Sequence, residues 1–499
     1  MSEIKINFTK LTNLSSSKNL TLVLILSEEE VKKSKFKSII DNQAPKFTGK
    51  NGQINIVGLD EKKILLLVGI GEEEKIDDLI LQKIGAKIIS FANPLEIENL
   101  ALFFGVEIDN GKLEYTAKNN PNNLCNLAFG ACLSSYSFNK YFNSKKAEKE
   151  LKIKSITIAS KDAGKSKEQF KQFEILTDNI LLTRNLVSEP ANVLYPESYA
   201  KICLEFKKDG LEVEVLDQKD MQKLGMNSLL GVGQGSIKES KLVVLKWLGA
   251  KDKKAQPLAF VGKGVTFDTG GISIKPSRNM EEMKTDMAGS AVVVSLLRLL
   301  AQRKAKVNVI GVIGLVENMP SGSAQRPGDI VKSMSGQTIE VIDTDAEGRL
   351  VLADALYYTN TKFKPELIVD LATLTGTIIA CLADVYCGLF SNDDDLSQKL
   401  IAAGAKTGEL TWRLPLSEEY DEIINSDIAD MNNIGSDSRG AGSITAAQFL
   451  KRFIGDTKWA HLDIAGVAWK SAGDQLAAKG ATGYGVRLLN QFIIDNYEK

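Results

Sequence analysis

Residues 261–286 read VGKGVTFDTGGISIKPSRNMEEMKTD, and glycines recur where the backbone would have to turn closely around a ligand. A short branched apolar run at 258–262 precedes this passage, and an apolar pattern with helical spacing follows it at 288–303. This order predicts a strand, a loop and a helix. Because the loops of a parallel sheet gather at the carboxyl ends of its strands, the passage also predicts a site at that edge.

A second charged segment, DTDAEGRL, lies at residues 343–350. Its Asp345, Glu347 and Arg349 occupy alternate positions, and alternate side chains of an extended segment share a face. The segment follows a predicted strand at 339–342, so we expect these three side chains to point toward the first passage. The two segments together predict one charged site at the carboxyl ends of two strands.

Four carboxylates would lie in this site: Asp268, Asp286, Asp345 and Glu347. Four negative charges in a dry cleft repel strongly, and two divalent cations would neutralise them. Shared carboxylates that hold two metal ions roughly 3.5–4 Å apart form a known hydrolytic device, in which a bridging water is the nucleophile. The chain has one histidine, His461. It lies in WAHLDIAG, a buried-looking strand without a cluster of ligands around it, so we predict a structural role for it.

Three cationic side chains accompany the carboxylates. Lys263 lies five residues before Asp268, so its neutral amine could reach the same metal ion. Lys275 in its protonated form could face the developing oxyanion of a tetrahedral intermediate. The planar fork of Arg349 suits a carboxylate-like anion. Surface salt bridges would explain any one of these residues equally well, so residue chemistry alone leaves catalysis and ion pairing open.

The chain has the composition of an ordinary globular protein: 499 residues, 25% charged, 43% apolar, with a net charge of -1. This charge gives no general attraction to nucleic acid or anionic lipid. No run reaches the roughly 18 apolar residues of a membrane span, and the N-terminus lacks a secretory signal, so we expect a cytoplasmic location. The five cysteines have no metal-ligand or redox spacing and are interpreted as reduced core thiols.

Strand-like and helix-like segments alternate along the whole chain, which predicts an α/β fold with mostly parallel sheets covered on both faces. We expect a smaller N-terminal α/β domain of the macro-like type at 1–164 and a connecting helix at 165–188. A larger catalytic domain at 189–499 would contain a mixed, mostly parallel central sheet flanked by helices. The sequence of the N-terminal part shows no cluster of acids, bases or metal ligands, so a scaffold, assembly or regulatory role is assigned to it.

Seven motifs resemble, in order, those of the cytosol aminopeptidase (leucyl aminopeptidase) family of two-metal exopeptidases. Three carry the site residues: VGKGVTFDTGGISIKP at 261–276, MKTDMAGSA at 283–291 and DTDAEGRLVLADAL at 343–356. The others are EPANVLYPESYA at 189–200, ENMPSGSAQRPGDIV at 317–331, DLATLTG at 370–376 and AGSITAAQFL at 441–450. The resemblance covers essentially all of the chain after about residue 185, whereas before residue 160 it is limited to length and strand-helix order.

The resemblance implies a set of metal ligands. Asp268 and Glu347 would bridge two divalent metal ions, Mn²⁺ or Zn²⁺. Lys263 and Asp286 would complete the tighter site, and Asp345 would complete the more exchangeable site through its side chain and main-chain carbonyl.

The resemblance also implies the remaining catalytic and binding roles. Lys275 would polarise the scissile carbonyl, and Arg349 would hold a bicarbonate ion that accepts the proton of the bridging water. The exposed metal would bind the free α-amine of the substrate. The residues implied to contact the first substrate residue are Met283, Thr373, Leu374 (through its backbone) and Gly376.

The function implied is that of a metal-dependent aminopeptidase. It would release N-terminal amino acids, preferably bulky apolar leucine-like ones, from peptides with a free N-terminus. The family also implies a homohexamer with the active sites facing an interior cavity, and no membrane partner is expected. One position departs from the family pattern, because Asp343 stands where asparagine usually precedes TDAEGR, and this puts the metal preference in question.

Two alternatives remain open from the sequence. A different carboxylate-held two-metal hydrolase, such as a phosphoesterase, would use the same residue types. Alternatively, the chain is a DNA-binding or regulatory protein with secondary peptidase activity, because residues 140–171 contain ten lysines against four acids. Basic runs without interleaved aromatic residues more often form a solvated surface, so nucleic acid is a weakly supported partner.

Overall fold

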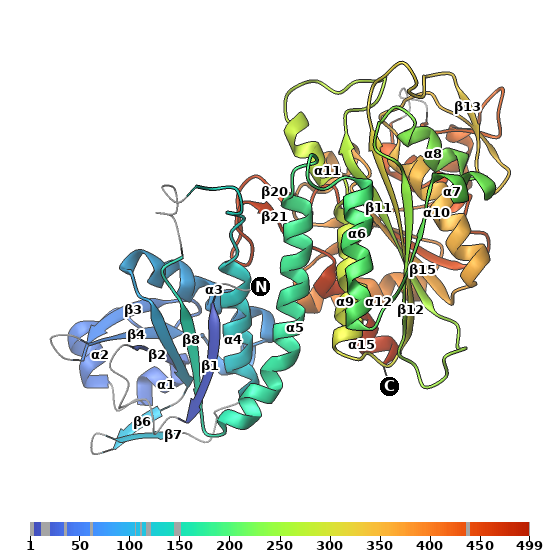
Figure 1. Cartoon of the computed structure of the whole chain (residues 1–499). Helices are drawn as coiled ribbons and strands as arrows, with labels where there is room; N and C mark the ends of the chain where they lie inside the picture. Colours follow the sequence, from blue (N-terminus) through green and yellow to red (C-terminus); the bar gives the residue numbers. More distant parts are fainter. Residues whose placement is uncertain are drawn as a thin grey trace. The chain divides into compact units, whose positions relative to one another are not determined.

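The computed structural model describes residues 4–10, 20–33, 37–59, 63–104, 106–109, 112–115, 121–143, 151–435 and 440–498. The chain forms two compact units, Met1–Leu181 with Ala472–Lys479, and Leu182–Ser471 with Gly480–Lys499. Helix α5 (Ala163–Ser188) runs from the first unit into the second (Figure 1). The predicted domain limits of 1–164, 165–188 and 189–499 stay a prediction.

The first unit is built on a six-stranded sheet in the order β1-β8-β5-β2-β4-β3. Its neighbouring strands are parallel except for the antiparallel pair β3–β4. The strands are β1 (Lys5–Lys10), β2 (Thr21–Leu26), β3 (Ile54–Gly58), β4 (Ile64–Gly69), β5 (Asn99–Phe104) and β8 (Ser155–Ser160), with a separate hairpin of β6 (Val106–Asp109) and β7 (Lys112–Tyr115). The helices are α1 (Glu28–Lys33), α2 (Lys37–Gln43), α3 (Asp78–Ala92) and α4 (Pro121–Ser134).

Both faces of this sheet are buried, and the strand period of two explains how. Val23 and Ile25 of β2 join the core formed with α3 and α4, whereas Leu24 and Leu26 join the core formed with α1 and α2. Successive side chains of a strand point to opposite faces, so a continuous apolar run fits a strand covered on both sides. Each fully buried aliphatic side chain contributes about 1.5–3 kcal/mol.

The second unit is built on an eight-stranded mixed sheet in the order β17-β16-β19-β15-β11-β12-β10-β9. Its strands are β9 (Glu212–Leu216), β10 (Lys241–Leu248), β11 (Leu258–Asp268), β12 (Asn308–Asn318), β15 (Leu367–Ala372), β16 (Cys387–Ser391), β17 (Thr411–Arg413) and β19 (Lys458–Asp463). Its helices are α6 (Pro196–Glu205), α7 (Gln218–Lys223), α8 (Asn227–Gly233), α9 (Ala288–Gln302), α10 (Gly348–Phe363), α11 (Gly376–Leu382), α12 (Asp394–Thr407), α13 (Glu418–Asp421), α14 (Gly442–Lys451) and α15 (Val486–Tyr497). Smaller strands are β13 (Ile330–Lys332), β14 (Thr338–Glu340) and β18 (Met431–Asn432) in one sheet, and β20 (Trp469–Lys470) and β21 (Gly480–Ala481) in a hairpin.

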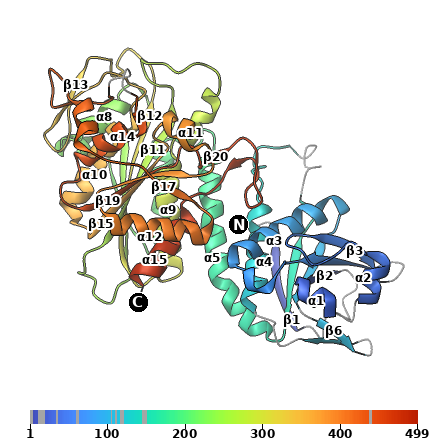
Figure 2. The same cartoon turned by 180° about the vertical axis from the view of Figure 1, so that it is seen from behind.

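Helices cover both faces of the central sheet, as Figure 2 shows from behind. Val261 of β11 is fully buried and packs with side chains of α8, α10 and α14. The next residue, Gly262, faces α9, and a Cβ added there would lie 2.6 Å from the Cα of Ser290. Glycine at this position therefore allows α9 to approach the sheet closely.

Four neighbouring strands of the central sheet, β19, β15, β11 and β12, run parallel. Asp268 at the end of β11 pairs with Asn318 at the end of β12, and Ala372 pairs with Asp463 at the end of β19. Parallel pairing therefore brings residues far apart in the sequence to one edge of the sheet, which is where open α/β sheets form their sites. None of the described helices has the length and apolarity needed to cross a bilayer.

The strand predicted at 339–342 is present as β14, but its expected place in the central sheet is wrong, because it lies in the small β13-β14-β18 sheet. The extended conformation predicted after it is also wrong. The segment that carries Asp345, Glu347 and Arg349 is not extended: it forms a turn at 344–345 and then begins α10 at Gly348. Asp345, Glu347 and Arg349 therefore do not share the face of a strand. Only their individual contacts show which of them lie close together.

Candidate active site

Lys263 stands at the centre of the site, inside β11. Its Nζ lies 2.7 Å from Asp286 Oδ1, 2.8 Å from Glu347 Oε1, and donates to the carbonyl of Thr373 at 3.0 Å. Lys263, Asp286 and Glu347 are 3%, 7% and 2% exposed. The side chain passes next to Gly348, where an added Cβ would lie 2.4 Å from Lys263 Cε. The glycine of DAEGR therefore leaves the space that the lysine occupies.

Lys275 joins two other carboxylates. Its Nζ lies 2.8 Å from Asp268 Oδ2 and donates to Asp345 Oδ1. The loop that carries Lys275 turns back through Gly270, whose φ of +87° favours glycine, and the Lys275 backbone N–H donates to the carbonyl of Thr269 at 2.9 Å. The two lysines thus connect the first charged passage to the second, because each contacts one carboxylate from 261–286 and one from 343–350.

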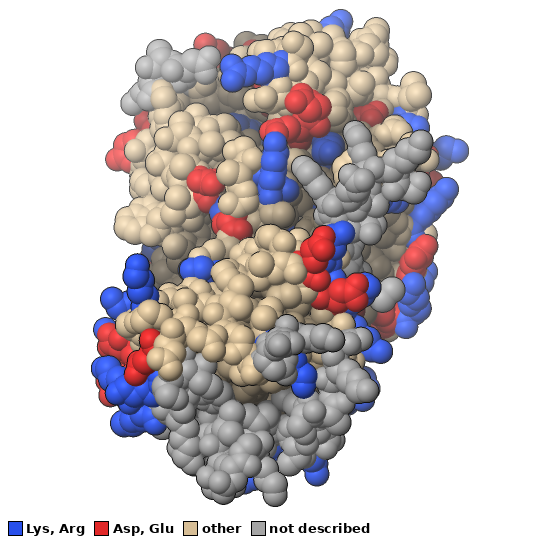
Figure 3. Space-filling view, turned by 90° about the vertical axis from the view of Figure 1, so that its left-hand side faces the viewer, with Lys and Arg blue, Asp and Glu red and all other residues tan. Residues whose placement is uncertain are grey.

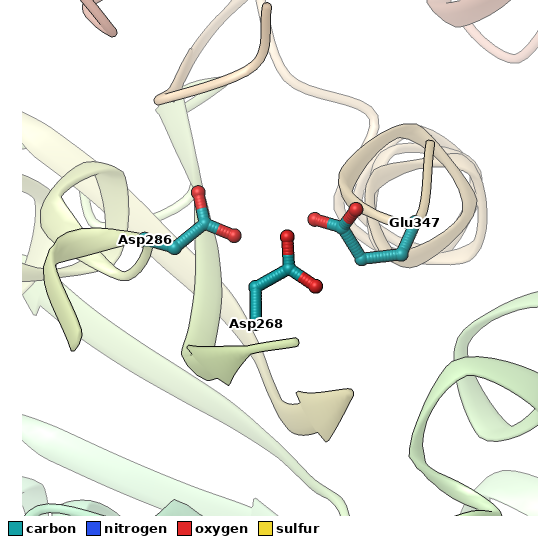
Figure 4. A group of neighbouring side chains, drawn as sticks. All are labelled: Asp268, Asp286 and Glu347. Atoms are coloured by element: carbon teal, nitrogen blue, oxygen red, sulfur yellow. The ribbon is translucent and has the colours of Figure 1, made fainter. Parts of the chain in front are cut away.

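Figure 4 shows the carboxyl groups of Asp268, Asp286 and Glu347 pointing toward a common point from a strand, a short helix end and a long helix. One oxygen from each lies within 4.8 Å of the others. Asp286 Oδ2 is buried and has no hydrogen-bond partner among the described residues. Buried carboxylates are otherwise paired, so this oxygen and the clustered charges fit a divalent cation with oxygen ligands.

The neighbouring carboxylates favour the protonated form of both lysines as long as no metal ion is bound. Burial alone would lower the pKa of Lys263, but the charges of Asp286 and Glu347 outweigh burial and raise it. Burial also opposes the charge on Lys275, but Asp268 and Glu347 outweigh burial there too and raise its pKa. Burial raises the pKa of Asp268 to about 6, and the neighbouring Glu347 adds to that increase.

Glu347 and Arg349 begin α10. Glu347 is the N-cap residue but makes no side-chain cap hydrogen bond, because its carboxylate turns toward Lys263 instead. A helix start without its usual cap is a local cost that functional sites often carry. Arg349 donates from Nη1 to the carbonyl of Asn433 at 2.8 Å, and its buried Nε has no hydrogen-bond partner among the described residues. Burial lowers its pKa to about 10, so it remains a cation that can hold an anion.

The residues predicted to contact the substrate come from the connection between β15 and α11, from the start of α11 and from a 3-10 helix. Thr373 follows β15, and its Oγ1 donates to Asp286 Oδ1 at 2.7 Å. The backbone N–H of Leu374 donates to Asp463 Oδ1 at 3.1 Å. Gly376 begins α11 beside open space, since an added Cβ would meet no atom within 4 Å. Met283 lies half-buried in the 3-10 helix Met280–Thr285, which ends next to Asp286.

Sequence reasoning missed three polar residues that hold the site. Asn318 donates to Asp268 Oδ1 at 2.8 Å and to the carbonyl of Thr344 at 3.0 Å. Asp463 accepts from the Leu374 N–H and from the hydroxyl of Thr375. Asn433 contacts the second charged segment. All three are polar residues at or just beyond the ends of strands, and this position in the sequence could have indicated that they belong to the site.

His461 and Asp343 have separate surroundings. His461 is fully buried, with Nδ1 2.6 Å from Asp370 Oδ1 and its ring stacked near Phe390 and Trp459. Asp343 is half-buried, and its Oδ1 accepts from the Asp345 N–H at 2.8 Å. The unusual carboxylate thus fixes the backbone of a site residue, as an asparagine oxygen at this position would also do.

The fold and the buried carboxylate-lysine cluster define a two-unit α/β protein with a site suited to metal ions. Residues 181–490 match the family described as "Cytosol aminopeptidase family, catalytic domain", and residues 41–146 match "Cytosol aminopeptidase family, N-terminal domain". A "Probable cytosol aminopeptidase" of Caulobacter vibrioides is 52% identical over 458 residues, covering 91% of this chain and 90% of the relative. One from Wolbachia pipientis is 50% identical over 469 residues, covering 93% and 90%.

Two solved structures have the same two-part fold. A mutant form of tomato leucine aminopeptidase is 30% identical with a TM-score of 0.83, covering 99% of this chain and 97% of that one. The bottromycin maturation enzyme BotP in complex with Mn is 29% identical with a TM-score of 0.80, covering 96% and 99%. The chain belongs to the cytosol aminopeptidase family and is an aminopeptidase, a peptide hydrolase, as the motifs predicted.

Proposed function

We propose that this aminopeptidase releases bulky apolar, leucine-like residues from the N-termini of peptides, with two divalent metal ions in the cluster described above. Asp268 and Glu347 would bridge the ions, Asp286 and Lys263 would complete one site, with Lys263 giving up its proton to bind as a neutral amine, and Asp345 would complete the other. Mn²⁺ or Zn²⁺ would suit these ligands, and the BotP structure contains Mn. Metal ions bound there supply Lewis acidity and promote the ionisation of water.

The residues around the metal ligands would stabilise developing charge, hold an anion and contact the substrate. The ammonium of Lys275 would donate to the oxygen of the scissile carbonyl and stabilise the negative charge that develops on it. Arg349 would hold bicarbonate, which supplies a proton acceptor; its buried Nε, which has no partner among the described residues, fits an anion. Met283, Thr373, Gly376 and the Leu374 carbonyl would contact the first residue of the substrate.

One observation carries this proposal: three buried carboxylates converge within 4.8 Å, and two lysines tie them to the second charged segment. Four carboxylates against two ammonium groups leave an excess of negative charge, counted over Asp268, Asp286, Asp345, Glu347, Lys263 and Lys275. Buried charges need such compensation, so the site favours added cations.

Hydrolysis of a chromogenic leucyl amide tests the proposal. The purified protein should release the chromophore, lose activity after treatment with a chelator, and regain it when Mn²⁺ or Zn²⁺ is added. An alanyl or glutamyl amide should react more slowly if the preference is for leucine-like residues. Turnover that survives chelation, or that no divalent metal restores, would rule out the metal-dependent mechanism, and hydrolysis of a phosphate ester instead would favour the phosphoesterase alternative.

The homohexamer, the cytoplasmic location and DNA binding remain proposals. The curated relatives are named cytosol aminopeptidases, and sedimentation would measure the assembly.

Part of the lysine-rich stretch 140–171 lies outside the described residues, at 144–150. Within the described part, Lys154 pairs with Glu98 and Lys171 with Glu168, and Figure 3 shows basic and acidic side chains intermixed on one face. A gel-shift assay without retention at low salt would exclude DNA as a partner.

A further inference from the structure

The segment that carries three of the site residues has little regular structure of its own. Between the end of β14 at Glu340 and the start of α10 at Gly348, the backbone makes only a bend and a turn. Irregular segments do not hold side chains to a fixed geometry by themselves, because their backbone groups lack ladder partners. Something outside the segment must fix it if Asp345 and Glu347 are to stay in place.

Asn433 supplies part of that fixation, together with Asn318, which donates to the Thr344 carbonyl, and Ser273, whose Oγ accepts from the Thr344 N–H. The Asn433 side chain is fully buried, with Oδ1 accepting from the Ile342 N–H at 2.8 Å and from the Asp343 N–H at 3.3 Å. Its Nδ2 donates to the Asp343 carbonyl at 2.6 Å and to the Ala346 carbonyl at 3.3 Å. One amide thus contacts both ends of the irregular turn, and both backbone groups of Asp343.

The backbone of Asn433 extends these contacts to the two sides of the segment. Its N–H donates to the Glu340 carbonyl at 3.0 Å, and its carbonyl accepts from Arg349 Nη1 at 2.8 Å. The contacts reach Asp345 through one further bond, because Asp343 Oδ1 accepts the Asp345 N–H. Asn433 is therefore connected to the strand before the segment, to the turn within it and to the helix that follows.

We propose that Asn433 is a positioning residue for the reaction, which sets the placement of Asp345, Glu347 and Arg349 by clamping residues 340–349. Only an amide side chain offers donors and an acceptor on one planar group, so neither aspartate nor leucine of similar shape can replace it. The inference rests on the proposed function for its catalytic part, whereas the clamp itself depends only on the contacts above.

Asn308 provides a matched control at the opposite end of β12 from Asn318. It is 3% exposed, and its amide clamps a different loop: Nδ2 donates to the carbonyls of Asp252 and Ala255, and Oδ1 accepts from the Ala250 N–H. Asn308→Ala and Asn433→Ala therefore remove three and four side-chain hydrogen bonds respectively, each at a buried asparagine that holds a loop. If Asn433 had a purely structural role, the two variants would change the thermal midpoint, the Mn²⁺ affinity and kcat to a similar extent.

The experiment compares the full-length wild type with Asn433→Ala, Asn433→Asp and Asn308→Ala. Mn²⁺ affinity is measured by equilibrium dialysis after chelator treatment, next to kcat and KM for the leucyl amide and the midpoint of thermal unfolding. Both Asn433 variants should lose about 10–100-fold in Mn²⁺ affinity and in kcat, as is typical when a residue that orients metal ligands is removed. Asn308→Ala should lower the thermal midpoint and leave Mn²⁺ affinity and kcat within about threefold of the wild type.

Two results would overturn the proposal. The first is an Asn433 variant whose Mn²⁺ affinity and kcat both match the wild type, and the second is an equal loss in Asn308→Ala. Asn433→Asp keeps the side-chain shape and one acceptor oxygen, so it carries the test if Asn433→Ala does not fold. If the wild type fails to hydrolyse the leucyl amide, the proposed function fails, and the difference in Mn²⁺ affinity between the Asn433 and Asn308 variants still decides the clamp.

Discussion

Replacing Gly348 by alanine should damage the site while changing stability little. The new Cβ would lie 2.4 Å from Lys263 Cε and 2.7 Å from both its Cδ and Nζ. Lys263 is 3% exposed and is enclosed by the site around it. Overpacking of this kind costs about 1–3 kcal/mol, but alanine is favoured over glycine in a helix by about 1 kcal/mol. The net destabilisation should therefore be roughly 0–2 kcal/mol.

The effect on turnover should be larger than the effect on stability. To relieve the clash, the Lys263 ammonium must move away from Asp286 and Glu347, which it now contacts at 2.7 and 2.8 Å. A misplacement of about 1 Å at a catalytic group typically costs on the order of 100-fold in rate. Initial rates on the leucyl amide at saturating Mn²⁺ measure this loss, and thermal unfolding measures the stability.

Gly164→Ala is the matched control for this prediction. Gly164 also lies in the first turn of a helix, α5, and its added Cβ would meet Asp162 Oδ1 at 3.4 Å, which is an ordinary contact. This variant should keep wild-type turnover and be equally or slightly more stable. If Gly348→Ala also kept wild-type turnover, the tight placement of Lys263 beside the helix start would have no functional meaning, and our reasoning about the DAEGR glycine would be refuted.

Two further variants test separate parts of the site. Lys275→Met should lower kcat by about 100- to 1,000-fold while KM changes little, because its charge is needed most in the transition state; near wild-type turnover would refute its role. Burial opposes the protonation of His461, but Asp370 outweighs burial and raises the pKa of the imidazole. The contribution of this pair to stability is therefore fully present below about pH 6.5, the unfolded value, and is lost as pH rises through the folded-state pKa. The thermal midpoint of the wild type should thus fall more steeply above about pH 6.5 than that of His461→Gln, and equal slopes would contradict this ion pair.

The sequence could predict which charges converge, because the chain places them at the ends of apolar strands. Lys263 and Asp268 occupy one strand, and the following loop and short helix carry Lys275 and Asp286. All four lie on one strand or on the loop and short helix after its carboxyl end, so the prediction of that strand alone brings them near each other. Their catalytic roles are not decided by that convergence and stay predictions.

The local backbone of the second segment was not predictable from alternation. Asp345, Glu347 and Arg349 alternate in sequence, but a turn and the first turn of α10 place them, not an extended strand. The side chain that fixes this turn, Asn433, lies 90 residues from Asp343 in the sequence. A single polar residue in a loop has no period that would reveal its partner, so only tertiary contacts identify it.

The cross-pairing of the lysines explains why the site has to form as one unit. Lys263 joins Asp286 to Glu347, and Lys275 joins Asp268 to Asp345, so each lysine contacts both charged segments. If only the first segment were in place, both lysines would lack one of their carboxylates, and breaking the buried Lys263–Glu347 pair alone would cost about 3–5 kcal/mol. The placement of residues 343–349 is therefore coupled to the charge balance of the first passage. Because Asn433 contacts that segment from a third part of the chain, the metal-binding geometry that we propose would depend on a residue that itself needs no contact with a metal ion.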